Sequence, residues 1–600
     1  FLATLLRRPT GVTKAQISSD RDAIESYYRL NGFSEVQVAT PVVNTKNDGT
    51  MTITFPVIEG PQTLLADVHV EGNQQVPTGR LPKLMLKPGD PLNPQFERAD
   101  IVALQTFYGD RGNAEVQVKP REEISDDKTS AMLAYVVAEG PEIKVDQVIV
   151  RGNTYTNTSV VLKQADIDKG DPFSYTSVLE AQRNLYRLGI FQRVDVQPEQ
   201  VGTSVSDRNI VISVEEGKDL TVSAALGFTS PMQSSSGRAS LLGSATIAHR
   251  NLFGTGRYIG LETIQTQNRS REDTFLTYRE PFVGPWQIPV QVTIFQSDAL
   301  RRGAHLRQRG TFVEASKVAR LQTRWSVRYE YRISDCLIES PGDVCDQALH
   351  ALLPGIDRSI TNIRISSITP TFFWDRRDDS LDPHRGFFTS ASTEYAFRAL
   401  AADAHFMKEF TQGSWYLPVT QRSVFAVSGR VGLIQALGGI VPLSERFTAG
   451  GESSNRAYPL DLLGTMCLDP LNRNCQATLI LLDNGKPAPI GGSGLFLANA
   501  EYRFPIFSSV GGAVFADAGN IFADTAIRFG DIRYGVGTGV RYLSPVGPVR
   551  FDVGYKLKRQ LIGCENPITL SDFSKVCGPG TGKQKFESPI AYFVTLGYAF

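Results

Sequence analysis

The chain has 600 residues, which is too long for one ordinary soluble core and predicts several domains. Its 62 Lys and Arg residues balance 62 Asp and Glu residues, so the net charge gives no electrostatic basis for binding nucleic acid. Hydrophobic residues make up 41% of the chain without an apolar run of 18 or more, which excludes transmembrane helices but leaves a transmembrane β-barrel open.

The first third of the chain contains three repeats. Val-Ile-Glu-Gly-Pro (57–61) recurs as Val-Ala-Glu-Gly-Pro (137–141), and Val-Glu-Glu-Gly-Lys (214–218) is a looser third copy. The segments 28–38, 108–118 and 186–196 align in the same way, which sets a period of roughly 80 residues. Each copy shows a strand ending in Gly-Asn, two helical segments, and two strands ending at Glu-Gly. The first copy lacks its opening strand, so we interpret the start at Phe1 as truncated.

Helical spacing is clearest in the third copy, where Val178, Ala181, Leu185 and Leu188 recur on one face and Gly189 ends the helix. Tandem β-α-α-β-β units of this size resemble POTRA (polypeptide-transport-associated) domains. We therefore predict domains at 1–61, 62–141, 142–218 and 219–600, the last being all β. The exposed sheet edges are expected either to accept a partner strand by β-augmentation or to act only as a rigid spacer.

From about Leu220 a two-residue alternation replaces the helical pattern. In 321–333 the residues from Leu321 to Ile333 at odd positions are mostly apolar, whereas those at even positions include Arg324, Arg328, Glu330 and Arg332. A polar lumen on one side and lipid on the other accounts for this pattern. We expect 16 strands, an even number as in bacterial barrels of one chain, starting near 220, 238, 255, 271, 286, 305, 320, 359, 386, 403, 421, 494, 508, 532, 546 and 588.

The last thirteen residues, Ser588 to Phe600, have large apolar side chains on one face of an extended strand. Because an unpaired strand edge is prohibitive in lipid, we expect this strand to close the barrel against the first strand near residue 220. The residues assigned to this seam are Leu220, Ala224, Gly227, Gly597 and Phe600.

Six cysteines fall as three close pairs: Cys336 with Cys345, Cys467 with Cys475, and Cys564 with Cys577. They lie in the loops after the predicted strands seven, eleven and fifteen, all on one side of the membrane and opposite the repeats. This placement predicts three local disulfides in an oxidising compartment. The alternative is buried free thiols.

Three motifs carry a resemblance to the BamA/TamA family of outer-membrane assembly factors. The longest loop holds Gly450-Gly451 and the tip Asn455-Arg456-Ala457-Tyr458. Phe515-Ala516-Asp517-Ala518-Gly519 is similar to the family's Phe-x-Asp-x-Gly element, and the segment 375–387 resembles a third signature. The resemblance covers the whole chain and implies that Arg456 folds into the lumen and meets Asp517, with Phe515 nearby. The family usually has glycine where this chain has Ala457, so the tip is expected to turn differently.

Without the resemblance, Arg456 would be interpreted as a solvated loop arginine and Asp517 as an ordinary lumen aspartate. Other signals are weak: the glycine-rich segment 535–539 lies inside a strand, the six histidines share no metal-ligand spacing, and no catalytic constellation stands out. We therefore predict a protein that is not an enzyme and has no cofactor.

The predicted function is insertion of β-barrel proteins into the bacterial outer membrane, with the repeats in the periplasm. Sideways opening of the seam between the first and last strands would allow a client strand to pair with the first strand. The expected partners are the lipid bilayer, unfolded β-barrel clients and periplasmic accessory proteins at the repeats. The alternatives are a two-partner secretion translocator that passes unfolded protein through the lumen and a plain porin.

Overall fold

The computed structural model divides into two compact units, Phe1–Gly217 and Lys218–Phe600. No helix of the described residues is long and apolar enough to cross a membrane. The structure describes residues 13–45, 51–199, 207–229, 240–267, 271–301, 304–319, 322–338, 343–349, 362–400, 402–420, 422–438, 441–468, 475–482, 486–507, 509–544, 547–569, 575–578 and 580–596.

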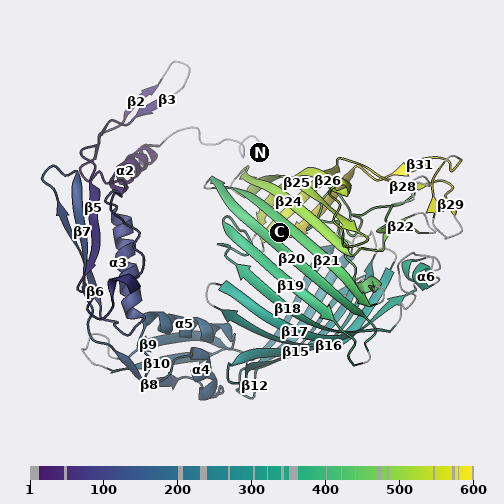
Figure 1. The fold of residues 1–600 in the computed structure, drawn as a ribbon, viewed down its shortest axis with the longest axis horizontal. Coiled ribbons are helices and arrows are strands. Elements are labelled where there is room, and N and C mark those ends of the chain that lie inside the picture. The colour runs from purple at the N-terminus through teal and green to yellow at the C-terminus, as the bar shows by residue number, and fades with distance from the viewer. Residues whose placement is uncertain are drawn as a thin grey trace. The chain divides into compact units, whose positions relative to one another are not determined.

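The first unit contains two complete repeats, each with a three-stranded mixed sheet (Figure 1). In the second repeat the sheet order is β5-β7-β6, and in the third it is β8-β10-β9. The first strand of each runs parallel to the central strand and the second runs antiparallel to it. The elements are β5 (Leu64–Glu71), α3 (Pro94–Gly109), β6 (Gln117–Ile124), β7 (Ser130–Ala138), β8 (Lys144–Arg151), α4 (Thr158–Ala165), α5 (Tyr175–Arg187), β9 (Phe191–Pro198) and β10 (Asp207–Glu216).

Helix α5 buries Val178, Ala181 and Leu185 against the sheet, as its spacing predicts, and Gly189 follows it with a φ of 68°. The expectation of two helices in every repeat is wrong for the second repeat. There the first helical segment is only the 3₁₀ turn η1 (Thr78–Arg80), because Pro77 and Pro82 flank it and proline interrupts helical hydrogen bonding.

The first repeat is represented by α2 (Lys14–Leu30) and four short strands, β1 (Gln37–Val38), β2 (Val42–Thr45), β3 (Met51–Thr54) and β4 (Val57–Ile58). Strands β1 and β4 pair with each other, and β2 and β3 form a separate hairpin. Helix α2 begins at Thr13, whose side chain accepts a hydrogen bond from the backbone of Gln16.

The repeated Gly-Asn and Glu-Gly signatures meet in space. In the third repeat Asn153 donates to the carbonyl of Thr156 and to the hydroxyl of Thr158, and Asn73 makes the corresponding bonds in the second. The Glu216 carboxylate accepts the backbone N–H groups of Thr154, Tyr155 and Thr156. The two signatures therefore form one clasp that ties the loop after the first strand to the end of the last.

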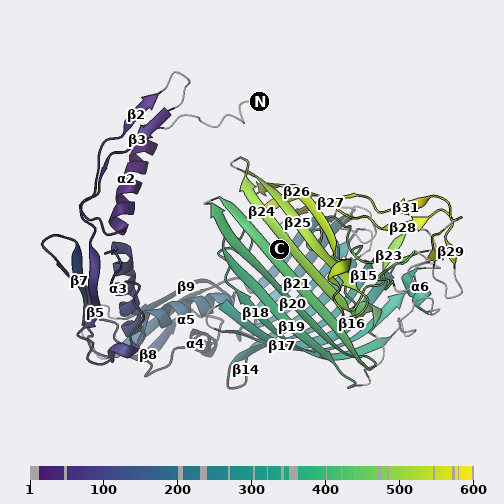
Figure 2. The same ribbon diagram turned by 45° about the horizontal axis from the view of Figure 1, so that its top comes forward.

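The second unit is a 16-stranded antiparallel sheet whose strands curve around a common axis as a barrel (Figures 1 and 2). Neighbours in the sheet follow chain order throughout. The strands are β11 (Leu220–Thr229), β12 (Ser240–Leu252), β13 (Arg257–Thr266), β14 (Arg271–Val283), β15 (Ile288–Arg301), β16 (Ala304–Ala319), β17 (Thr323–Leu337), β18 (Ile363–Asp375), β19 (Gly386–Ala396), β20 (His405–Thr420), β21 (Ser423–Gly438), β24 (Gly494–Pro505), β25 (Val510–Phe522), β26 (Arg533–Ser544), β27 (Gly547–Lys556) and β32 (Ile590–Leu596). The predicted strand number is confirmed.

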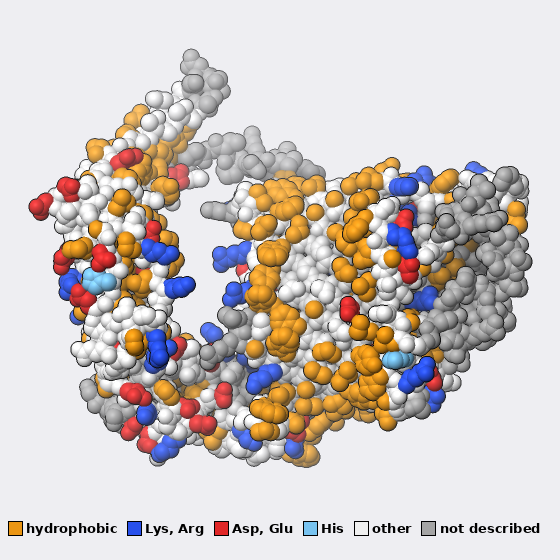
Figure 3. All heavy atoms as spheres, viewed as in Figure 1, with side chains coloured by type: hydrophobic (Ala, Val, Ile, Leu, Met, Phe, Trp, Pro, Cys, Tyr) orange, Lys and Arg blue, Asp and Glu red, His pale blue; other side chains and the backbone are white. Residues whose placement is uncertain are grey.

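The two faces of the sheet differ as the alternation predicts. On β17, Trp325 and Val327 are 58% and 48% exposed, whereas Ser326 and Arg332 are 8% and 6% exposed. Leu321 lies outside the described residues. Figure 3 shows bands of hydrophobic side chains over the outer face of the strands. The outer face is therefore apolar, and the inner face holds the charges.

Short elements lie in the long connections of the barrel. They were not predicted, since two- or three-residue strands leave little periodicity in a sequence. Three antiparallel strand pairs are formed by β22 with β23, β28 with β31, and β29 with β30. The bounds are α6 (Val344–Leu349), η3 (Leu443–Glu445), β22 (Leu479–Leu481), β23 (Pro487–Pro489), η4 (Phe529–Asp531), β28 (Leu561–Cys564), β29 (Ile568–Thr569), β30 (Lys575–Val576) and β31 (Gln584–Phe586).

Candidate functional site

The connection between β21 and β24 folds into the interior of the barrel. Its tip, Asn455 to Tyr458, is fully buried, and Arg456 is the largest fully buried side chain among the described residues. Gly450 and Gly451 make the necessary turn with φ angles of 116° and 100°, and a Cβ at Gly450 would lie 2.3 Å from the carbonyl oxygen of Pro459. The backbone N–H of Gly451 then donates to the carbonyl of Tyr458 at 2.8 Å, which closes the loop.

Arg456 meets Asp517 of β25 through three hydrogen bonds. Its backbone N–H and Nε donate to Oδ2, both at 2.9 Å, and Nη2 donates to Oδ1 at 2.8 Å. The guanidinium carbon lies 3.5 Å from the centroid of the Phe515 ring, which adds a cation–π contact. The structure thus brings together Arg456, Asp517 and Phe515.

A second carboxylate also binds Arg456, and the sequence analysis did not predict it. Glu501 of β24 accepts a hydrogen bond from Nη1 of Arg456, one from Arg503 at 2.8 Å, and one from Arg541 of β26 at 3.3 Å. Arg541 also donates to Asp552 of β27 at 2.5 Å. Four adjacent strands therefore share one buried ionic network with the loop tip. Alternating charges on the lumen face were the available signal, but they do not specify which pairs meet.

The space for the tip is made by glycines in the wall. A Cβ at Gly535 of β26 would lie 2.5 Å from the Ala457 Cβ, and one at Gly554 of β27 would lie 2.2 Å from the carbonyl oxygen of Arg456. Ala457 is not among the described residues with positive φ, so alanine does not strain this turn. That the tip turns differently from one with glycine at this position stays a prediction. Glycine inside a strand often marks the close approach of another segment, and within 535–539 that is the role of Gly535, whereas Gly537 lies against the Phe515 ring.

Tyr458 anchors the other side of the tip. Its hydroxyl accepts a hydrogen bond from Nε of Arg533 at 3.2 Å, and Arg533 pairs with Glu587 at 2.6 Å. The Lys556 ammonium lies 4.9 Å from the centroid of the Tyr458 ring. Gly519, the last residue of the Phe-x-Asp-x-Gly element, lies against β24, since a Cβ there would be 2.4 Å from the Phe496 carbonyl oxygen and 2.6 Å from Leu497.

The beginning of this loop is held against a different part of the wall. Glu445 pairs with Arg332 of β17 at 2.8 Å and with Lys408 of β20 at 3.6 Å. Phe447 then packs where Gly432 of β21 has no side chain, since a Cβ there would lie 2.5 Å from the ring. The loop is consequently tied to the barrel at its beginning and at its tip.

At the two ends of the sheet, β11 pairs with β12 over Leu220–Thr229, and β32 pairs with β27 over Ile590–Leu596. Leu220, Ala224 and Gly227 lie in β11, whereas Gly597 and Phe600 lie outside the described residues. Within the described part of the chain, the ladders include none between β11 and β32. Ile590, Tyr592 and Val594 are exposed and Ala591 and Phe593 are buried, which matches the predicted faces.

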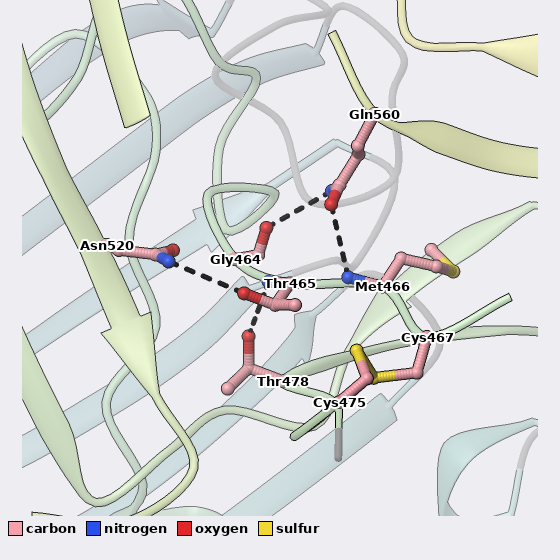
Figure 4. The surroundings of a disulfide bond; sticks show 8 residues. All are labelled: Gly464, Thr465, Met466, Cys467, Cys475, Thr478, Asn520 and Gln560. Atoms are coloured by element: carbon pink, nitrogen blue, oxygen red, sulfur yellow. Dashed lines mark hydrogen bonds between the residues drawn. A yellow bond between two sulfur atoms is a disulfide. The ribbon is translucent and has the colours of Figure 1, made fainter. Parts of the chain in front are cut away.

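The three predicted disulfides are present, at Cys336–Cys345, Cys467–Cys475 and Cys564–Cys577. Figure 4 shows that Gln560 donates to the carbonyl of Gly464 and accepts from the N–H of Met466, while Asn520 contacts Thr465. Cys564 and Cys577 pack in one apolar cluster with Leu479 and Leu481 of β22. The disulfide loops after β21 and β27 therefore form one packed structure.

The segment 375–387 forms the turn between β18 and β19. Asp375 pairs with Arg377 at 2.7 Å, and Asp378 accepts the backbone N–H groups of His384 and Arg385. A Cβ at Gly386, where φ is 101°, would lie 2.0 Å from the carbonyl oxygen of Arg376. The motif therefore shapes the connection between β18 and β19.

Comparison with known proteins agrees with this architecture. Residues 251–561 match the Omp85 superfamily domain, and residues 64–140 and 143–217 match a POTRA model described as a surface antigen variable number repeat. The outer membrane protein assembly factor BamA of Nitratidesulfovibrio vulgaris is 24% identical over 91% of this chain and 66% of its own length. BamA of Neisseria meningitidis serogroup B is 22% identical over 93% and 72%, respectively.

Among solved structures, BamA from Haemophilus ducreyi lacking POTRA domains 1–3 has the same fold, with a TM-score of 0.56 and 17% identity over 85% of this chain and 96% of that one. The chain spans about two thirds of the length of the first curated relative. It is an outer-membrane protein with periplasmic POTRA repeats. The Omp85 domain covers more than half of the residues, and the chain therefore belongs to the Omp85 superfamily.

Proposed function

We propose that this protein inserts β-barrel proteins into the outer membrane by sideways opening between β11 and β32. The observation that carries the proposal lies at the two ends of the sheet. Among the described residues, each strand from β11 to β32 pairs with the next one in chain order, whereas no ladder joins β32 to β11. The boundary between β11 and β32 is therefore the place where the barrel opens most easily. The curated relatives named as assembly factors support the same function.

In this mechanism the free edge of β11 receives a client strand. Main-chain hydrogen bonds to the client satisfy this edge, which has no ladder to β32 among the described residues, so strand addition requires neither a covalent step nor nucleotide. The protein acts without enzymatic chemistry, and its substrate is the unpaired edge of an unfolded β-barrel client. Because the alternating side chains of a client match the apolar outer face and polar inner face of β11, each added hairpin enters the bilayer already oriented.

In this mechanism the buried loop rigidifies the strands on the β32 side of the opening. Arg550 of β27 donates to the carbonyl of Glu452 in the loop at 3.1 Å and to the hydroxyl of Thr595 in β32. Together with the Arg456 network, these bonds join the loop to β24, β25, β26, β27 and β32. We propose that this group of strands moves as one block during opening.

The POTRA repeats would deliver clients or bind accessory proteins through the outer strands of their sheets. These strands are β5 and β6 in the second repeat and β8 and β9 in the third. β-Augmentation at such edges uses main-chain hydrogen bonds and therefore accepts many sequences. We retain the domain boundaries 1–61, 62–141, 142–218 and 219–600 as part of this proposal.

A disulfide lock tests the mechanism. Ala224→Cys in β11 is combined with Leu596→Cys, or with a neighbouring residue of β32 whose Cα lies within about 7 Å, and the bridge is formed by oxidation. The matched control is Ala224→Cys with Ala245→Cys, which bridges β11 to its registered neighbour β12. We expect the seam lock to reduce client insertion into proteoliposomes at least about tenfold, a difference of ~1.4 kcal/mol in barrier, and the control lock to leave it unchanged.

Mild reduction should restore insertion in the seam-locked protein, while the parent protein under the same reductant reports any effect on the native disulfides. Full insertion through a fully cross-linked seam would refute the mechanism. A translocator that uses only the lumen would pass its substrate equally well with either lock.

A further inference from the structure

A groove of about 760 Å³ lies on the barrel between β14 and β17, on strands other than those that hold Arg456. Two registered rows of side chains across these four strands form its sides. One row is Thr274, Gln296, Arg309 and Ile333, and the next is Leu276, Ile294, Thr311 and Tyr331. Its size is in the range of small-molecule sites.

The floor between the two rows is backbone. Phe295 of β15 and Gly310 of β16 are registered partners, and both line the groove. The Phe295 ring stacks on Phe275 at 6.5 Å on the opposite face of the sheet, and a Cβ at Gly310 would lie on that same face, 3.0 Å from the Cβ of Arg332. Neither residue therefore places side-chain atoms in the groove.

The groove opens on the membrane-facing side of the barrel. Tyr331 and Ile333 share their face of β17 with Trp325 and Val327, which are exposed. The other face carries the buried Arg332 and the Arg328–Glu314 pair at 2.6 Å. Because the outer face of such a barrel contacts lipid, the occupant of the groove must come from the bilayer.

A charged row borders the groove toward the end of the strands that carries the disulfide loops. Glu272, Asp298, Arg307 and Asp335 are registered partners in adjacent strands. Arg307 pairs closely with Asp298 at 2.6 Å, and Asp335 accepts the backbone N–H of Asn362 at 2.6 Å. Arg309 remains 52% exposed, with the Asp335 carboxylate 3.8 Å away, so its guanidinium has donors available at the mouth of the groove.

We propose that this groove binds one phosphate-bearing lipid of the leaflet on the side of the disulfide loops. An acyl chain lies over the Phe295–Gly310 floor between Leu276, Ile294 and Tyr331, and the phosphate accepts hydrogen bonds from Arg309. The planar guanidinium suits a phosphate, whereas the apolar side chains and the exposed backbone floor suit a hydrocarbon chain. This site is independent of the seam and of client insertion.

Native mass spectrometry of the purified full chain, with phospholipid or diacylglycerol of the same acyl chains added to the detergent, tests the proposal. Thr311→Phe fills the groove, and its matched control is Thr411→Phe at an exposed position on the outer face of β20. Arg309→Gln removes the phosphate donor, and its control is Lys317→Gln, exposed on the same face of β16 outside the groove. Heat-modifiable migration in gels confirms that each variant is folded.

We expect both groove variants to retain phospholipid about fivefold less than the parent, and both controls to match the parent. Glycerophosphate without acyl chains should not compete. Equal retention by Thr311→Phe and Thr411→Phe would overturn the groove as the site. Retention of diacylglycerol equal to that of phospholipid, or an Arg309→Gln protein that still prefers phospholipid, would overturn the assignment of Arg309 to the phosphate.

Discussion

Arg456 shows how a loop residue becomes part of a buried core. Its guanidinium is surrounded by Asp517, Glu501 and the Phe515 ring, and 1% of its surface is exposed. Removing water from a charge is costly unless every donor finds an acceptor. Here the carboxylates come from neighbouring strands, where Glu501 is registered with Phe515 and Asp517 with Asn499, so the two acidic residues are diagonal neighbours in the wall.

Arg456→Ala should leave Asp517 and Glu501 buried without their cation and destabilise docking of the loop by about 3 kcal/mol. Limited proteolysis within the loop should then become faster, and client insertion should fall, while the protein remains in the membrane. Arg422→Ala, at an exposed turn between β20 and β21, is the control and should change neither. The double variant Arg456→Ala with Asp517→Asn should recover part of the loss; no recovery would argue against the ion pair as the cause.

The close contact between Ala457 and Gly535 leads to a second prediction at the scale of single residues. Gly535→Val places side-chain atoms where the Ala457 methyl lies, so the tip should be expelled and proteolysis of the loop should increase as strongly as in Arg456→Ala. Ala457→Gly only removes a methyl group and should cost about 1 kcal/mol or less. A Gly535→Val protein with a fully protected loop would show that the tip does not need this space.

At the scale of single elements, the clasp of the third repeat predicts a pH dependence. Burial tends to raise the pKa of Glu216, but hydrogen bonds from Thr154, Thr156 and Tyr155 outweigh it and hold the pKa at about 2. A depressed carboxyl pKa contributes stability above its ordinary value of 4.5, and this contribution is lost as the pH falls through about 2. The clasp should therefore be intact from pH 7 down to pH 4.5 and weaken below that range.

Hydrogen exchange at the amide of Thr156 in the full chain measures this effect. Glu216→Gln should lower the protection of that amide by about 2 kcal/mol at pH 7 and by much less near pH 2. Glu215→Gln, the exposed neighbour that lies 3.8 Å from Arg193, should have little effect at either pH. Equal protection in Glu216→Gln and the parent at pH 7 would contradict the clasp.

The disulfide loops lead to a further prediction at the scale of single elements, about the stability of the loop after β27. Cys564→Ser with Cys577→Ser opens a bridge between residues 13 positions apart, which should destabilise the outer loops by about 3 kcal/mol. Proteolysis within 561–586 should accelerate, whereas the barrel strands should keep their heat-modifiable migration because their ladders do not depend on this bridge. Loss of the barrel itself would show that the loops contribute to its folding.

On the scale of the whole molecule, the chain combines two kinds of sheet that differ in size and in what their edges and faces contact. The mixed sheets of the POTRA repeats are small and keep outer strands on both sides, which permits strand addition. The large antiparallel sheet presents an apolar surface to lipid and encloses a polar interior. The proposed insertion of a client would use both properties, because the client would be received in water and released into the bilayer.

The sequence by itself determined the features that depend on local order. A two-residue period marks each strand and its faces, so the sixteen strands and the apolar outer surface follow from the residue pattern alone. Cysteines 8 to 13 positions apart have few other partners within reach, so their pairing could also be predicted. The clasped repeats were visible because the same short signatures recur at a constant period.

Only the tertiary structure decided which distant residues meet. Glu501 as second partner of Arg456, Gly535 as the space for Ala457, and Glu445 beside Arg332 all depend on how a long loop enters the barrel. The groove over Gly310 depends on the register of four strands at once. Periodicity assigns a side chain to a face, but contacts between segments far apart in the chain are set by register and by packing, which no local pattern encodes.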